Sequence, residues 1–175
     1  MRLAIFTCAL LAAGAAVAGS VAAGEPTSGT LSVEGAKGLV VLELRGSTLG
    51  RLATGTVRVT DMTPRDRFTP LVVGRKLTQE RIGPRTVIYR GQGLRFRMLG
   101  GGYRLLVRGE GLSLSAVGRG SVVLHGDRKM PTDDAGVFSV AGVDCGEEPE
   151  ACLPLPSSPE RYVLQQPESE PGSTR

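Results

Sequence analysis

Residues 94–109 read LRFRMLGGGYRLLVRG, two short alternating runs around three glycines. Apolar and polar side chains alternate with a period of two residues, which is typical of β-strands that bury one face. Glycine adopts positive φ without steric cost, so Gly100 and Gly101 predict the two-residue turn of a β-hairpin. This hairpin would bury one apolar face, made of the facing pairs Met98 and Tyr103, Phe96 and Leu105, and Leu94 and Val107.

The other face of the predicted hairpin carries four arginines: Arg95, Arg97, Arg104 and Arg108. Arg97 would face Arg104, and like charges directly opposite each other are unfavourable by up to about 1 kcal/mol. Three sources could offset this repulsion: water and salt, acids from a neighbouring strand or from the C-terminal segment, or an external polyanion. The four arginines are therefore our candidate binding residues for an anionic partner.

The charge distribution along the chain is uneven. Residues 37–126 carry sixteen Lys and Arg against five Asp and Glu, whereas residues 127–175 carry four against ten. The C-terminal segment is therefore a candidate internal counter-charge for the arginine face. Eighteen arginines against three lysines, with 25 glycines, are typical of a GC-rich bacterial gene, so basicity alone is weak evidence for phosphate recognition.

Short alternating segments recur along the chain. Residues 29–35, 55–61, 85–91 and 120–126 share a small hydroxyl residue, two alternating apolar positions and a turn residue, and 136–142 is a fifth, weaker copy. Residues 49–59 also match residues 114–124 at every apolar position. The pattern predicts an all-β fold, a single compact antiparallel sandwich or barrel-like domain built from repeated hairpins. A short β-solenoid is the alternative, although the repeats drift in length.

The two ends of the chain differ from this β domain, which we place at residues 29–164. Residues 1–22 have one early cation, an apolar run and small residues before a cleavage site, the pattern of a secretory signal peptide. Residues 23–28 form a linker, and the polar, proline-bearing residues 165–175 predict a disordered tail. With no second hydrophobic span, the mature protein should lack a transmembrane segment and be exported, to a periplasmic, cell-wall-associated or extracellular place.

Removal of the signal peptide leaves two cysteines, Cys145 and Cys152. An oxidising compartment favours their disulfide, which would clip a loop over residues 145–152. A single histidine argues against a Cys/His zinc site. Calcium needs several inward oxygens, which a small disulfide loop seldom supplies, so we predict no metal and no cofactor despite the acids Asp144, Glu147, Glu148 and Glu150.

Catalytic arrangements are weakly represented. His125 and Asp127 could belong to a relay with Ser113, Ser115 or Ser121, but no nucleophile motif such as G-x-S-x-G occurs. Glu43 with Glu80 or Glu110 is a loose candidate for a carboxylate pair of glycoside hydrolysis. In an arginine-rich sheet, the simpler explanation of such acids is that they form ion pairs with arginines. We therefore predict no enzyme, with a hydrolase as the least favoured function.

Nucleic acid is also disfavoured as a partner. Bases stack on aromatic side chains while arginines follow the phosphates, so both should lie on one face. Phe96 and Tyr103 have the opposite phase to the arginines, and export removes the usual nucleic-acid partners.

The run RFRMLGGGYRLLVRGEGLSLSAVGRGSVVL at residues 95–124, with GVFSV at 136–140, resembles small exported β-rich proteins of GC-rich bacteria. The resemblance implies a single β domain and carries no activity or site residue. The expected function is a non-enzymatic, envelope-associated structural or interaction module. Its partner would be another envelope protein or, through the arginine hairpin, an anionic envelope polymer or surface.

Overall fold

The computed structural model describes residues 28–64, 69–129 and 134–165, and these form one open antiparallel sheet. The strands are β1 (Thr30–Asp61), β2 (Leu71–Ile82), β3 (Thr86–Met98), β4 (Gly102–Gly126), β5 (Val137–Ser139), β6 (Leu153–Pro154) and β7 (Glu160–Leu164), with a 3₁₀ turn at Pro149–Ala151. The predicted all-β antiparallel domain is confirmed. The predicted signal peptide, nearly all of the linker and the tail beyond residue 165 lie outside the described residues. No helix in the described ranges is long and apolar enough to cross a membrane.

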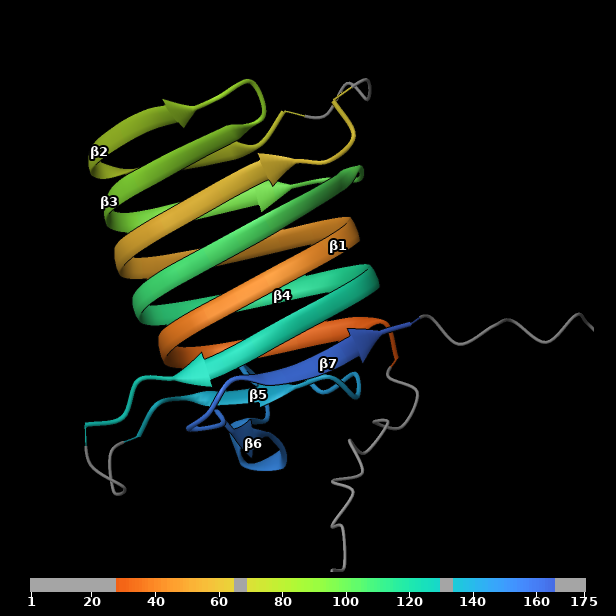
Figure 1. The fold of residues 1–175 in the computed structure, drawn as a ribbon. Coiled ribbons are helices and arrows are strands. Elements are labelled where there is room, and N and C mark those ends of the chain that lie inside the picture. Colours follow the sequence, from red (N-terminus) through yellow and green to blue (C-terminus); the bar gives the residue numbers. More distant parts are fainter. Residues whose placement is uncertain (1–27, 65–68, 130–133, 166–175) are drawn as a thin grey trace, which may run out of the picture.

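The sheet coils on itself because two strands are unusually long. Val107 of β4 pairs with both Val40 and Val57 of β1, and Tyr103 pairs with both Leu44 and Asp61. Strand β1 therefore passes on both sides of β4, and its successive passes are 17 residues apart. Figure 1 shows the ribbon crossing alternately the front and the back of the molecule, like a flattened coil.

The chain path is one long hairpin wound around itself. Strands β1 and β2 wind in one direction, the chain reverses near Gly83, and β3 and β4 return between the turns of β1. The sheet order is accordingly β2-β3-β1-β4-β7, with every pairing antiparallel. The domain is thus compact, as predicted, and its winding is that of a short coil.

Each turn crosses two layers with a shared core. Layer 1 consists of residues 38–45, 55–61, 78–82, 86–91, 102–109 and 120–126 with β7, and layer 2 of residues 30–34, 47–52, 71–73, 93–98 and 111–117 with β5. Alternate side chains of both layers point inward and form one apolar cluster that includes Leu42, Phe96 and Leu105. Burial of this apolar area is the main stabilising contribution.

A column of glycines marks one edge of the coil, where the chain passes between the layers. We call it the glycine corner; its residues on five neighbouring passes are Gly126, Gly38, Gly109, Gly55 and Gly91. A Cβ atom on Gly38 would lie 2.1 Å from the carbonyl oxygen of His125, and one on Gly109 would lie 2.1 Å from that of Thr54. Only glycine permits this approach of neighbouring backbones.

The glycine corner also resets which side chains point inward. Along β1 the buried side chains lie at even positions from Ala36 to Leu52 and resume at Val57, and along β4 they stop at Val107 and resume at Leu112. Each gap is an odd number of residues, so the alternation changes phase at the corner. This shift explains why an odd, 17-residue turn keeps the apolar side chains inside.

The predicted facing of residues 94–108 is confirmed, whereas their predicted pairing is wrong. All six apolar side chains are buried and all four arginines are exposed. However, β3 and β4 do not pair with each other, because β1 lies between them: Met98 pairs with Thr48, and Tyr103 pairs with Leu44 and Asp61. Gly100 and Gly101 do adopt positive φ, but they carry the chain around the edge of the coil. Their local turn preference cannot specify which distant strand supplies the hydrogen bonds.

Tyr103 also has a polar contact inside the coil. Its hydroxyl lies 2.8 Å from the Thr48 hydroxyl, so the buried phenol is hydrogen-bonded. Burial raises the pKa of Tyr103, although the hydrogen bond with Thr48 lowers it.

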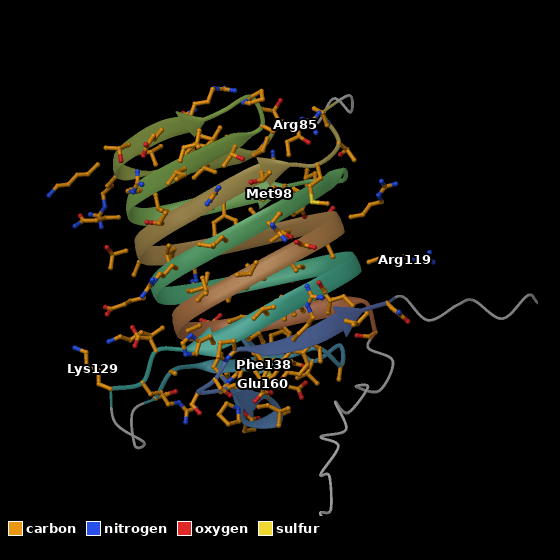
Figure 2. The ribbon with its side chains drawn as sticks, in the orientation of Figure 1. Arg85, Met98, Arg119, Lys129, Phe138 and Glu160 are labelled. Carbon is orange, nitrogen blue, oxygen red and sulfur yellow. A yellow bond between two sulfur atoms is a disulfide. The ribbon has the colours of Figure 1, made fainter. Side chains whose placement is uncertain are left out.

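The C-terminal segment closes one end of the coil. Strand β7 pairs with β4, while β5 pairs with β1 and β6, so the weaker repeat copy predicted at 136–142 does contain a strand. The rings of Phe138 and Tyr162 pack with centroids 5.0 Å apart. Figure 2 shows Phe138 and Glu160 at the end of the coil that holds the first turn of β1. Burial, followed by the hydrogen bond to Glu160 and that residue's charge, raises the pKa of Tyr162 to about 12. We call this segment, residues 134–164, the cap.

The predicted Cys145–Cys152 disulfide is present in the cap, with Cα atoms 5.8 Å apart. Cys145 is fully buried, and its backbone N–H donates to the Ser32 hydroxyl at 2.9 Å. The disulfide therefore closes the clipped loop, and the hydrogen bond from Cys145 to Ser32 ties this loop to the first pass of β1.

Substituting Gly109 by alanine should destabilise the protein severely. The added methyl would meet the Thr54 carbonyl, so we expect urea unfolding to show a loss of about 3 kcal/mol or more. Gly83→Ala is the matched control, because Gly83 also has positive φ but nothing lies within 4 Å of its added Cβ. The free energy of unfolding of that variant should fall by only about 1 to 2 kcal/mol, because of backbone strain. Equal losses would contradict the role of the glycine corner.

Opening the disulfide should loosen the cap. Replacing both Cys145 and Cys152 by serine should lower the free energy of unfolding by about 2 to 3 kcal/mol, the range expected for so short a loop. Urea unfolding with and without a reductant measures the effect. The reductant should not change the unfolding midpoint of the double-serine variant. A wild-type midpoint that the reductant does not lower would contradict the prediction.

Candidate functional site: an arginine groove

The outer surface of layer 2 is hollowed into a groove of about 620 Å³. We call it the arginine groove; its lining includes Glu34, Leu49, Arg51, Leu71, Val73, Arg95, Arg97, Ser113, Ser115 and Asp144. A second hollow of about 720 Å³ continues it towards Arg75 and shares Glu34, Arg51, Arg95 and Ser113 with it. The groove therefore runs across five adjacent passes of the coil.

The coil divides the four predicted site arginines between the two layers. Arg95 and Arg97 belong to layer 2 and line the arginine groove. Arg104 and Arg108 belong to layer 1, where they pair in register with Glu43 and Leu39 of β1. The single four-arginine face that the hairpin predicted does not exist, because the chain changes layers between Met98 and Tyr103.

The groove contains a third arginine, Arg51, in addition to Arg95 and Arg97. It is the register partner of Arg95 on the neighbouring strand, and Arg97 lies two residues further along β3. Residues two apart on a strand are separated by about 7 Å, so Arg95 and Arg97 place two exposed guanidinium groups on one strand. Arg51 and Arg95 carry like charges on adjacent strands, an arrangement that is unfavourable without a counter-charge.

Glu34 supplies that counter-charge to Arg51. Its Oε1 accepts hydrogen bonds from Arg51 Nη2 at 3.0 Å and from the Ser113 hydroxyl at 2.8 Å. Arg51 Nε also donates to the Ser113 hydroxyl at 3.1 Å. Two residues from two other passes of the coil, Glu34 and Ser113, thus hold the guanidinium of Arg51 in place beside Arg95.

Arg95 and Arg97 have no such partner in the part of the chain that the structure describes. Among the described residues no carboxylate forms an ion pair with Arg95, Arg97 or Arg108, whereas Arg104 pairs with Glu43 of β1. An acid on a neighbouring strand, one of the predicted sources of neutralisation, therefore acts on Arg104. The acids of the cap pair with none of the four predicted arginines within the described ranges, although Asp144 lines the groove.

Apolar and hydroxyl groups surround the groove arginines. Leu49, Leu71 and Val73 lie about half exposed, at 51%, 50% and 47%. Leu49 lies between Ser115 and Arg97 in the register, and Leu71 lies on the other side of Arg97. The groove thus alternates apolar, hydroxyl and cationic groups across its width.

The residues that the sequence offered as catalytic candidates do not come together as a relay or as a free carboxylate pair among the described residues. His125 pairs in register with Leu39, and it has no hydrogen bond to a serine or carboxylate among the residues described. The three acids weighed as a carboxylate pair are each ion-paired: Glu43 with Arg104, Glu80 with Arg90 and Glu110 with Lys37.

The acidic loop of the cap is organised by its own backbone. Asp144 Oδ1 accepts the Gly146 N–H at 2.8 Å, and the Asp144 carbonyl accepts from the Glu147 and Glu148 N–H groups. Within the described ranges, no three or more His, Cys, Asp or Glu side chains gather in a way that could hold a metal ion.

Sequence reasoning missed Arg51 and Glu34. They are 17 residues apart, one turn of the coil, and neither lies in the run at 94–109. A spacing of 17 residues does recur between glycines, as at Gly38 and Gly55 and at Gly109 and Gly126. Recognising that period would have placed Glu34 and Arg51 at the same position on successive turns of β1.

Comparison of the chain with known protein families, curated proteins and solved structures finds no match.

Proposed function

We propose that this protein is a non-enzymatic β domain exported to the cell envelope, where its arginine groove binds an acidic polysaccharide. The observation that carries the proposal is the pair Arg95 and Arg97, exposed in a groove and without an ion-pair partner among the described residues. Keeping uncompensated guanidinium groups beside Arg51 is unfavourable in the free protein, and an external carboxylate would relieve it.

The mixed lining of the groove supports a polysaccharide over a structureless cationic surface. Sugar rings present both C–H faces and hydroxyl groups, which suit the half-exposed Leu49 and Leu71 and the neighbouring Ser115. Carboxylates of an acidic sugar would pair with the guanidinium groups, which offer a planar fork of donors. A groove open at the surface also suits a polymer, which binds along its length.

Nucleic acid fits the groove less well. Single-stranded binding relies on aromatic side chains beside the cations. Phe96 borders the groove but is only 3% exposed, and Tyr103 is buried in the core. No other aromatic side chain lines the groove in the described part of the chain.

The disulfide supports the exported location. Disulfides persist in oxidising compartments and are rare in the cytosol. Cys145 and Cys152 close a disulfide within the cap, and the first 22 residues have the composition of a secretory signal peptide.

Removing the two unpaired arginines should weaken binding to a polyuronate. We expect Arg95→Ser with Arg97→Ser to raise the Kd for alginate about tenfold, since exposed charge pairs contribute roughly 0.5 to 1 kcal/mol each. Titration calorimetry or salt elution from an alginate matrix measures the change. Arg108→Ser with Arg119→Ser is the matched control, because it removes the same charge outside the groove. Equal effects of the two pairs, or equal binding to neutral dextran, would overturn the proposal.

Removing the groove acid should act in the opposite direction. Glu34→Gln releases Arg51 from its ion pair and removes a negative charge, so the affinity for alginate should rise about twofold to fivefold, corresponding to roughly 0.5 to 1 kcal/mol. Glu43→Gln is the matched control, because Glu43 pairs with Arg104 on layer 1. A rise of the same size in both variants would show that net charge alone governs binding.

A further inference from the structure

The two ends of the coil are finished differently. The cap covers one end with the short strands β5, β6 and β7 and a disulfide. At the opposite end β2 pairs with β3 alone, and no other described strand lies along its outer edge. Figure 1 shows β2 as the last turn at that end. An unpaired strand edge presents a row of backbone N–H and C=O groups that can pair with another strand.

The free edge is long and partly apolar. It spans Leu71–Ile82, and every side chain in it except Val72 is exposed. Leu71, Val73, Leu77 and Ile82 are among the most exposed large apolar residues of the protein. Exposed apolar residues gathered on a strand edge are typical of an interaction surface.

Features of the same edge restrict which strand can pair with it. Arg75, Lys76 and Arg81 place cations along the strand, and charges discourage indiscriminate pairing. The register of β2 against β3 shifts between Val73 and Thr78, and Lys76 has a φ of 48° there. A partner must therefore match both the charges and the irregular centre of the edge.

A second copy of the same strand matches the charges of the edge. A two-fold axis between Leu77 and Thr78 would place two β2 strands antiparallel. In that register Arg75 of each copy faces Glu80 of the other, and Val73 faces Ile82. Each contact occurs twice, as symmetry demands of a self-complementary surface.

We propose that the protein forms a head-to-head dimer in which the free edges of two β2 strands pair in this register. The axis lies where β2 passes from layer 2 to layer 1, so each coil continues the sheet of the other and the two caps lie at the far ends. Glu80 Oε2 already accepts from Arg90 Nη1 of its own chain at 2.7 Å, which leaves Oε1 for Arg75 of the second copy. Val73 and Arg75 also line the arginine groove or the hollow that continues it, but the pairing rests on the strand edge and not on ligand binding in the groove.

Sedimentation velocity of the purified protein, from low to high micromolar concentration, tests the dimer. The wild type should shift from monomer to dimer as its concentration rises. Arg75→Glu would set two acids against each other twice, and Glu80→Arg would do the same with two cations. Each variant alone should raise the dimer dissociation constant about tenfold or more.

An equimolar mixture of the two variants is the decisive sample. Arg75→Glu in one copy faces Glu80→Arg in the other, and the unchanged Arg75 and Glu80 face each other, so the mixture should recover dimers. Arg119→Glu is the matched control, since Arg119 is exposed and points away from the coil far from β2 (Figure 2). Because Glu80→Arg also removes the ion pair with Arg90, its thermal unfolding confirms that it folds.

Three results would overturn the proposal. If the protein stays monomeric at every concentration, β2 does not pair with a second copy, and a strand of another protein becomes its candidate partner. A dimer that Arg75→Glu does not weaken uses a different surface. A mixture that recovers no dimer excludes the proposed register.

Discussion

Backbone contact at the glycine corner is the constraint on which the rest of the structure depends. Five glycines, one from each neighbouring pass, let the sheet bend between its two layers while adjacent passes remain hydrogen-bonded. A Cβ at Gly38 or Gly109 would lie 2.1 Å from a carbonyl oxygen of the next pass, so a side chain would force the passes apart. The bend also shifts the alternation of buried side chains, and this is why a 17-residue turn can bury one continuous core.

Winding a long hairpin in this way distributes charge that the linear chain concentrates. Residues 94–108 hold four arginines, yet the coil sends two to each layer. Layer 2 then adds Arg51 from a different turn, together with Glu34 and Ser113, which hold it in place. The arginine groove is therefore a product of neighbouring passes, and no single strand contains it. Arg95 and Arg97 remain uncompensated among the described residues, which is the basis for an anionic ligand.

The coil also has two unlike ends. The cap covers the first turn with short strands, the Phe138–Tyr162 contact and the disulfide, so that edge of the sheet is blocked. The other edge, β2, is long, free and self-complementary in charge. The two proposals draw on different parts of the coil: ligand binding uses side chains on layer 2, and dimerisation uses the backbone edge of β2.

The sequence by itself determined the properties that depend on near neighbours in the chain. Period-two alternation correctly predicted the strands and which side of each faces inward, from Leu94 to Val107, and the cysteine spacing predicted the clipped loop. The pattern therefore placed Arg95 and Arg97 correctly on the outer face. Only the tertiary structure decided which strands lie side by side: it placed β1 between β3 and β4, separated Arg104 and Arg108 from the groove, and brought Glu34 and Arg51 together. The physical reason is that sheet pairing is made by backbone groups common to all residues except proline, so local pattern leaves the partner strand open until the whole coil packs its core.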